Sequence, residues 1–158
     1  KLKSPFIEKS IFESCKIKKN IVEKDEKEKS LRKILNFGHT FAHAYEASLN
    51  YSKKLNHGEA VILGINSALN FSYKNNLIEK KDYNLILKHL ASLNLPSNIK
   101  KYFKIKDVNK ILSFMSKDKK NNSDKINLVL LKKIILPIID KKYNKKNLYV
   151  FLKNELND

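Results

Sequence analysis

The sequence predicts a mainly α-helical fold with one small β-hairpin. Apolar residues recur at intervals of three and four over most of the chain, which is typical of the buried face of a helix. Only two short segments, 126–131 and 134–139, are rich in residues that favour strands, and they predict a hairpin near residues 126–139. With 158 residues and 42% hydrophobic content, the chain can form a real core. We therefore expect a single helical domain over residues 1–158.

The first element is a helix over residues 5–24. Ser4 can cap it, and Pro5 suits the first helical position. Ile7, Ile11, Cys15 and Val22 follow helical spacing, so we interpret Cys15 as a small, inert hydrophobe of an apolar stripe. Lys18 falls on the same stripe, where its stem can lie buried with the ammonium in water, or its ammonium can point into a cleft.

A charged connector, 23–30, follows this helix, and its composition indicates a solvated loop. The remaining apolar patterns predict further helices, separated by polar turns and by a Lys- and Asn-rich loop at 116–124. We expect these helices at 31–49, 57–76, 79–93, 107–115 and 144–155.

The formal net charge of +17 raises the question of a nucleic-acid partner. The lysines, however, are scattered among Asp and Glu and mostly lack interleaved aromatic residues, so we expect no specific nucleic-acid function. No segment approaches the roughly 20 apolar residues of a membrane span, and no signal-peptide pattern opens the chain. One cysteine suits a reducing compartment, and we expect a cytoplasmic protein.

Chemically scarce residues are concentrated between Arg32 and Gly64. This stretch holds the only arginine, all three glycines and three of the four histidines. Arg32, Asn36, His39, His43 and Glu46 are spaced 4, 3, 4 and 3 apart, which places them on one face of a helix. Such a face can simply be solvent-exposed. We favour a polar cleft, because the exposed surface elsewhere consists of Lys and Glu.

Histidines four positions apart on a helix can share a metal ion, although this spacing alone is weak evidence. His57 offers a further ligand at a helix start, where the helix dipole disfavours protonation of the ring. The remaining histidine, His89, lies between Lys88 and Leu90, far from the polar residues of this stretch, and we interpret it as structural.

These residues form a double motif that resembles the 3-dehydroquinate synthase family. It consists of LRKILNFGHTFAHAYE at 31–46 and LNHGEAV at 55–61. The similarity extends upstream through 14–18 and Asp25–Glu26, and downstream through 115–120. It therefore covers most of the chain, and the double motif is highly specific.

The resemblance implies a two-domain enzyme of which this chain is the helical, C-terminal domain. Family members carry an N-terminal Rossmann-like domain that binds NAD, and we expect that domain, together with a third zinc ligand on an upstream helix, to be absent from this chain. The complete enzyme is expected to be a homodimer. Its reaction, the second step of the shikimate pathway, converts 3-deoxy-D-arabino-heptulosonate 7-phosphate into 3-dehydroquinate and phosphate, with NAD returned unchanged.

By motif position, His39 and His57 look like zinc ligands, with Co²⁺ as a substitute metal, and His43 looks like a substrate-contacting and catalytic histidine. Lys18, Glu28, Arg32 and Asn36 look like substrate-pocket groups, Lys18 and Glu28 with a catalytic part. One of Lys119 and Lys120, with Lys120 preferred, looks like a further cation for the substrate's phosphate or carboxylate.

The chain departs from the family pattern at Ala42, where Gly is usual, at Lys29–Ser30, and at Tyr45. Three alternatives stay open. The first is another sugar-phosphate cyclase, which would keep the metal and NAD but accept a different phosphate. The second is a metal-dependent alcohol dehydrogenase, whose reaction eliminates no phosphate and would leave the several predicted cations unexplained. A non-catalytic basic helical binding module would explain the charge but not the polar helix face.

Overall fold

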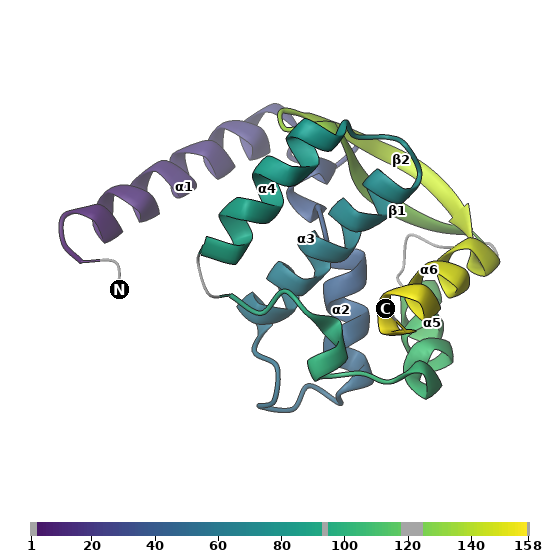
Figure 1. Cartoon of the computed structure of the whole chain (residues 1–158). Coiled ribbons are helices and arrows are strands. Elements are labelled where there is room, and N and C mark those ends of the chain that lie inside the picture. The colour runs from purple at the N-terminus through teal and green to yellow at the C-terminus, as the bar shows by residue number, and fades with distance from the viewer. Residues whose placement is uncertain (1–2, 93–94, 118–124, 158) are drawn as a thin grey trace. The chain divides into compact units, whose positions relative to one another are not determined.

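The computed structural model describes residues 3–92, 95–117 and 125–157, and the chain divides into two compact units, 1–36 and 37–158. Figure 1 shows the helices and the single hairpin. The mainly helical fold with one hairpin is therefore confirmed. The expectation of a single domain over 1–158 stays a prediction.

The first unit consists of helix α1 (Phe6–Lys24), a turn and the short 3₁₀ helix η1 (Leu31–Asn36). Helix α1 begins one residue later than expected, with Pro5 at the N-cap position and no side-chain cap. The turn is ordered by Asp25, whose carboxylate accepts hydrogen bonds from the backbone N–H groups of Lys29, Ser30 and Arg32 at 2.8, 2.8 and 3.0 Å. These bonds lower the pKa of Asp25, because they favour the charged carboxylate. The connector is therefore a specific turn.

The second unit contains five α-helices, two 3₁₀ turns and the hairpin among its described residues. Its elements are α2 (His39–Ser48), α3 (His57–Lys74), α4 (Lys80–Ser92), η2 (Ile99–Lys101), η3 (Ile105–Asp107), α5 (Val108–Lys117), β1 (Lys125–Lys133), β2 (Leu136–Asn144) and α6 (Lys145–Asn157). Helix α2 packs against α3 and α5, and α3 also contacts β1 and α4. The expected loop at 116–124 falls largely on 118–124, outside the described residues.

The core of the second unit lies between α2, α3, α5, α6 and the hairpin. Ile126, Leu128 and Leu130 alternate inward along β1, as expected for a strand with one buried face. Two aromatic rings at the centre, Phe71 and Phe151, meet edge to face at 5.0 Å between ring centres. This core fixes α2 and α3 against each other, and these two helices carry the three histidines of the motif.

The antiparallel hairpin pairs Ile126 with Tyr143 and Leu130 with Ile138, and its register shifts between Leu128 and Leu130 and again near its turn. Both strands are longer than expected, because backbone pairing continues beyond the apolar residues that identify a strand in the sequence. Helix α6 follows directly after β2 and packs against α5 and β2. The hairpin thus joins two parts of the helical core.

Candidate functional site

The predicted helix 31–49 is interrupted, and this interruption positions the histidines. The chain forms η1 up to Asn36, leaves helical geometry at Gly38, and starts α2 at His39. Gly38 has a φ of 80°, and a Cβ there would lie 2.5 Å from the backbone nitrogen of Ile65. Only glycine accepts both this conformation and this close approach. A single helix over 31–49 was therefore a wrong expectation, and the five-residue polar face is continuous only from His39 to Glu46.

Three histidines meet where α2 and α3 begin. His39 is the first residue of α2, His43 lies one turn later, and His57 is the first residue of α3. The ring centre of His39 lies 5.5 Å from that of His43 and 6.3 Å from that of His57, and the rings of His43 and His57 are also 6.3 Å apart. The structure therefore brings together the three histidines that the motif singled out.

Two of these rings are held by oxygen acceptors through the same ring nitrogen. Nδ1 of His57 lies 3.1 Å from both carboxylate oxygens of Glu46, and Nδ1 of His39 lies 3.4 Å from the carbonyl oxygen of Phe37. A carboxylate and a carbonyl only accept, so each Nδ1 carries a proton, and in the neutral form of each imidazole Nε2 then holds the free lone pair. This arrangement is typical of metal-ligating histidines, whose other nitrogen is anchored by an oxygen.

Electrostatics keep His39 in the form that a metal needs. Its partial burial lowers the pKa of His39, the Phe37 carbonyl acts in the opposite direction, and the neighbouring His43 and His57 lower it further. A lowered pKa favours the neutral imidazole, which is the form that donates its lone pair.

The described residues fit part of a metal site. Two imidazoles bound to one zinc ion at nitrogen–metal distances of about 2.0–2.1 Å have ring centres about 5–6 Å apart, and the three histidine pairs here, at 5.5, 6.3 and 6.3 Å, all lie near this separation. Over residues 3–92, 95–117 and 125–157, however, no group of three or more His, Cys, Asp or Glu side chains is arranged to hold a metal by itself. A metal ion held by these imidazoles would therefore need a further ligand.

Glu46 is a functional candidate to which the sequence analysis gave no role, although it placed Glu46 on the polar face. Its side chain is 12% exposed, whereas that of its partner His57 is 63% exposed. The largely buried carboxylate of Glu46 is thus the fixed member of the pair and orients the exposed imidazole of His57. The sequence indicates only that Glu46 lies one helical turn after His43. It does not indicate the partner of Glu46, because His57 lies 11 residues later on another helix.

The other predicted groups lie in the first unit or outside the described residues. Lys18 is exposed on α1, and Nδ2 of Asn36 donates a 2.6 Å hydrogen bond to Glu28. One guanidinium nitrogen of Arg32 donates to the carbonyl of Glu26 at 2.7 Å. The structure thus brings Glu28 and Asn36 together. The predicted cations Lys119 and Lys120 lie outside the described residues.

Two residues that the sequence analysis set aside are exposed. Cys15 was expected to be an apolar filler but is a solvent-accessible free thiol on α1, because no residue of that helix is buried. His89 is exposed in the last turn of α4, so it is not a buried core histidine.

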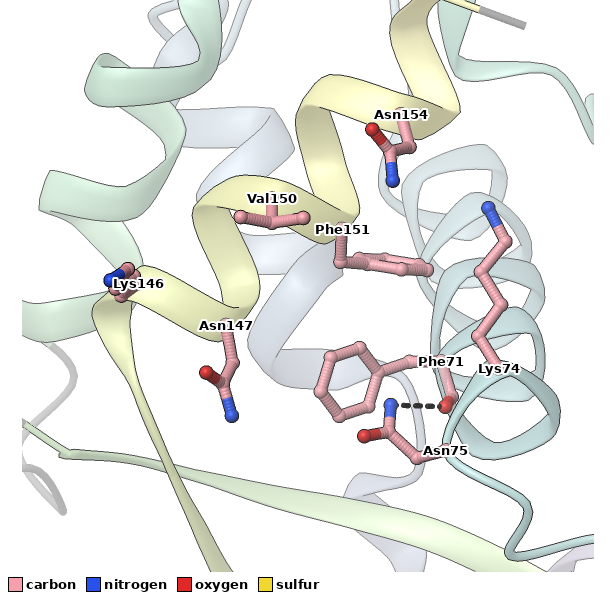
Figure 2. A pocket seen from close by; sticks show the side chains of 8 residues that line it. All are labelled: Phe71, Lys74, Asn75, Lys146, Asn147, Val150, Phe151 and Asn154. Atoms are coloured by element: carbon pink, nitrogen blue, oxygen red, sulfur yellow. Dashed lines mark hydrogen bonds between the residues drawn. The ribbon is translucent and has the colours of Figure 1, made fainter.

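A separate pocket of about 310 Å³ lies between the end of α3 and the start of α6 (Figure 2). The rings of Phe71 and Phe151 form its apolar part, and Lys74 and Asn75 extend from α3 beside them. Lys74 also forms an ion pair with Glu155 at 2.9 Å. None of the predicted site residues lines this pocket, so it is distinct from the histidine cluster.

Comparison with solved structures defines the class of fold. Two crystal structures of 2-deoxy-scyllo-inosose synthase match with TM-scores of 0.62 and 0.60 at 22% and 21% identity, covering 80% and 82% of this chain and 35% and 33% of theirs. The first was solved in complex with carbaglucose-6-phosphate, NAD⁺ and Co²⁺. At this identity the match shows the fold, so the chain shares a helical domain with this class of synthases.

Sequence comparison gives the family. Residues 1–121 match the family model described as 3-dehydroquinate synthase C-terminal. The 3-dehydroquinate synthase of Pelagibacter ubique is 60% identical over 155 residues, covering 98% of this chain and 42% of the relative. That of Zymomonas mobilis is 38% identical over 148 residues, covering 93% and 39%. The chain belongs to the 3-dehydroquinate synthase family and spans about two fifths of the length of these relatives.

No helix in the described part of the chain combines the length and the apolar character that crossing a lipid bilayer requires.

Proposed function

We propose that this chain is the C-terminal, metal- and substrate-binding part of a 3-dehydroquinate synthase. The complete enzyme converts 3-deoxy-D-arabino-heptulosonate 7-phosphate into 3-dehydroquinate and phosphate, using NAD and zinc. The observation that carries the proposal is that a chain aligned over 98% of its length with a 3-dehydroquinate synthase gathers His39, His43 and His57 at one place, two of them anchored through Nδ1.

His39 and His57 would hold the metal through Nε2. Zinc, or Co²⁺ in its place, supplies a Lewis acid that polarises alcohol and ketone oxygens when bound. Two protein nitrogens are one fewer than the three protein ligands of a usual catalytic zinc site. We therefore assign the third ligand to the part of the enzyme that precedes this region.

His43 would act on the substrate. It lies one turn from His39, it is exposed, and no hydrogen bond holds its ring among the described contacts. It is thus free of the Nδ1 anchoring that characterises the other two rings. An imidazole in this setting can donate to a phosphate oxygen or carry a proton between substrate atoms near neutral pH.

The first unit would supply groups for the charged ends of the substrate. Arg32 uses one guanidinium nitrogen on the Glu26 carbonyl, and its other donors suit a phosphate or a carboxylate. The Glu28–Asn36 hydrogen bond fixes a polar pair in the same unit. Lys18 and Lys120 would add cations, and Lys18 and Glu28 would assist proton movement.

The remaining features belong to the complete protein. The NAD site is assigned to an N-terminal domain, and the solved structure of 2-deoxy-scyllo-inosose synthase with NAD⁺ and Co²⁺ supports the same pair of cofactors here. We infer that the complete enzyme is a cytoplasmic homodimer, as expected for a member of this family.

The test uses one continuous polypeptide in which this chain follows the preceding part of the Pelagibacter ubique relative. With NAD and zinc, it should release phosphate and form 3-dehydroquinate from the seven-carbon substrate, and the 158-residue chain alone should not. Arg32→Lys should lower kcat/KM about 5- to 150-fold, corresponding to about 1–3 kcal/mol for a charge-assisted hydrogen bond. Turnover of a different sugar phosphate but not of this substrate would contradict the proposal and favour another cyclase.

A further inference from the structure

Helix α1 exposes an unusual number of large apolar side chains. Phe6, Ile11, Phe12 and Ile17 are 67%, 58%, 65% and 58% exposed, and Ile7 is 39% exposed. No residue of α1 is buried, and no described residue of the first unit, from 3 to 36, is buried. Isolated exposed apolar residues are ordinary on a protein surface, but five on one helix of 19 residues are not.

These residues are arranged as a face. At 100° per residue, one half of the helix circumference holds Phe6, Ile17, Ile21, Ile7, Ile11 and Val22, in that order, together with the polar residues Ser10, Ser14, Lys18 and Lys24. We call the six apolar residues the apolar face of α1. Phe12 lies outside this half, beside lysines and glutamates of the opposite side. A face of this width exceeds the stripe that a helix needs to pack on a single neighbour.

The comparisons indicate what covers this face. The matching family model describes a C-terminal region, and the chain spans 42% and 39% of the lengths of two 3-dehydroquinate synthases. In such a protein, a longer part of the polypeptide precedes α1. A helix with an uncovered apolar face near the beginning of the shared region is therefore next in sequence to that preceding part.

We propose that the apolar face of α1 is the surface on which the preceding part of the polypeptide packs, through an apolar face of its own. The proposal rests on the proposed function in one respect, namely that the chain operates as the C-terminal part of a longer protein. It goes further by naming the surface. Lys18 lies within this half of the helix, between Ile7 and Ile11 around the circumference, so the same packing would surround its ammonium with protein.

Two other occupants are less consistent with the residues. A lipid surface would favour a basic polar side, whereas the other half of α1 mixes Lys9, Lys16 and Lys19 with Glu8, Glu13 and Glu23. A second copy would present the same face and the same charges. Neither accounts for the matched position of the chain within longer relatives.

Cys15 provides a direct probe. It is the only cysteine in the chain, its thiol is exposed, and it lies at one edge of the apolar face, next to Val22 around the circumference. We would mix the chain with the preceding part of the Pelagibacter ubique relative, its own cysteines replaced by serine, and follow the reaction of Cys15 with a disulfide reagent such as dithionitrobenzoate. Cys15 should react rapidly in the chain alone and at least tenfold more slowly in the mixture.

A matched pair of variants locates the contact. Ile7→Gln with Ile11→Gln should weaken binding of the preceding part about tenfold or more per side chain, because each loses the burial of a large aliphatic group. Glutamine preserves helix propensity, so circular dichroism should remain unchanged. Ile135→Gln, at a side chain that is 90% exposed on the hairpin turn, removes an equal apolar group elsewhere and should leave binding unchanged.

Three results would overturn the proposal. The first is a bound complex in which Cys15 reacts as fast as in the free chain. The second is slow reaction of Cys15 in the free monomer. The third is protection of Cys15 that depends only on the concentration of this chain, which would indicate self-association. The readout requires no catalysis. An unprotected Cys15 in the bound complex, with activity in the continuous polypeptide, would refute this surface and leave the proposed function. Protection of Cys15 in the complex, with no activity in the continuous polypeptide, would do the reverse.

Discussion

At the residue scale, the contact between Glu46 and His57 determines how the imidazole of His57 is oriented. The carboxylate contacts Nδ1 of His57 with both oxygens, at 3.1 Å each, and leaves Nε2 for a metal. A carboxylate in this position fixes the tautomer, orients the ring and raises the basicity of the coordinating nitrogen. Metal affinity should therefore depend on a residue that does not touch the metal.

Replacing Glu46 tests this dependence. In the complete enzyme, Glu46→Gln should lower zinc affinity about 10- to 100-fold, because the uncharged amide orients His57 less firmly and makes its ring less basic. Zinc affinity can be measured by competition with a chromophoric chelator. Glu79→Gln, at an exposed position just before α4, is the matched control and should bind zinc as the unaltered protein does. Equal affinities in the two variants would remove Glu46 from the metal site.

The scarcity of histidine in the sequence indicated three residues that lie together in the structure, while their roles and that of Arg32 stay predictions. Arg32, His39, His43 and His57 were singled out because the chain otherwise uses Lys and Asn, and the structure gathers the three histidines. The role of Glu46 could not be read, because an acidic residue one turn along a helix gives no indication of its partner on another helix. The anchoring of His39 by the Phe37 carbonyl was equally invisible, since it depends on the backbone break at Gly38.

At the element scale, the junction between α2 and α3 depends on small residues. A Cβ on Gly64 would lie 2.2 Å from the carbonyl oxygen of Gly38 and 3.1 Å from the Cβ of Ala42. Ala42, where the resemblance leads us to expect glycine, is fully buried at this junction. Its methyl group is accommodated because residue 64, which it faces, is a glycine. The helices approach closely enough that no further methyl group fits.

Gly64→Ala should therefore destabilise the second unit by about 1–3 kcal/mol, the usual cost of overpacking a close-packed site. Gly58→Ala is the matched control, because a Cβ on Gly58 meets nothing within 4 Å, and better helix propensity should make it neutral or slightly stabilising. Urea unfolding followed by circular dichroism measures both. Equal stabilities of the two variants would show that the junction can open to admit a methyl group.

Element prediction was most accurate where one pattern corresponded to one element. The hairpin and helices α3 to α6 were expected within a few residues of their bounds, since apolar periodicity reports directly on burial. The helix 31–49 failed because η1 and α2 both have helical spacing, so periodicity runs through the break. The reason for that break, the backbone of Ile65 against Gly38, is tertiary and has no local signal.

At the scale of the whole molecule, the second unit has a complete core and the first unit does not. The second buries aromatic and aliphatic side chains from helices α2, α3, α5 and α6 and from both strands, including the partly buried Ile138 and Tyr143 on β2. The first has no buried residue between positions 3 and 36. The chain spans only about two fifths of the length of its relatives, and this contrast agrees with our proposal that the preceding part of a longer protein packs on the first unit.

We expect His39 and His57, but not His43, to hold the metal, and the zinc content of histidine variants of the complete enzyme measures this. Each histidine is replaced by alanine in turn, the protein is dialysed, and bound zinc is measured by mass spectrometry together with turnover. His39→Ala and His57→Ala should lose zinc, and His43→Ala should keep it with lower turnover. His89→Ala, at an exposed position on α4, should keep both zinc and turnover. Loss of zinc from His43→Ala as complete as from His39→Ala would contradict the account and make the two histidines of α2 the metal-binding pair.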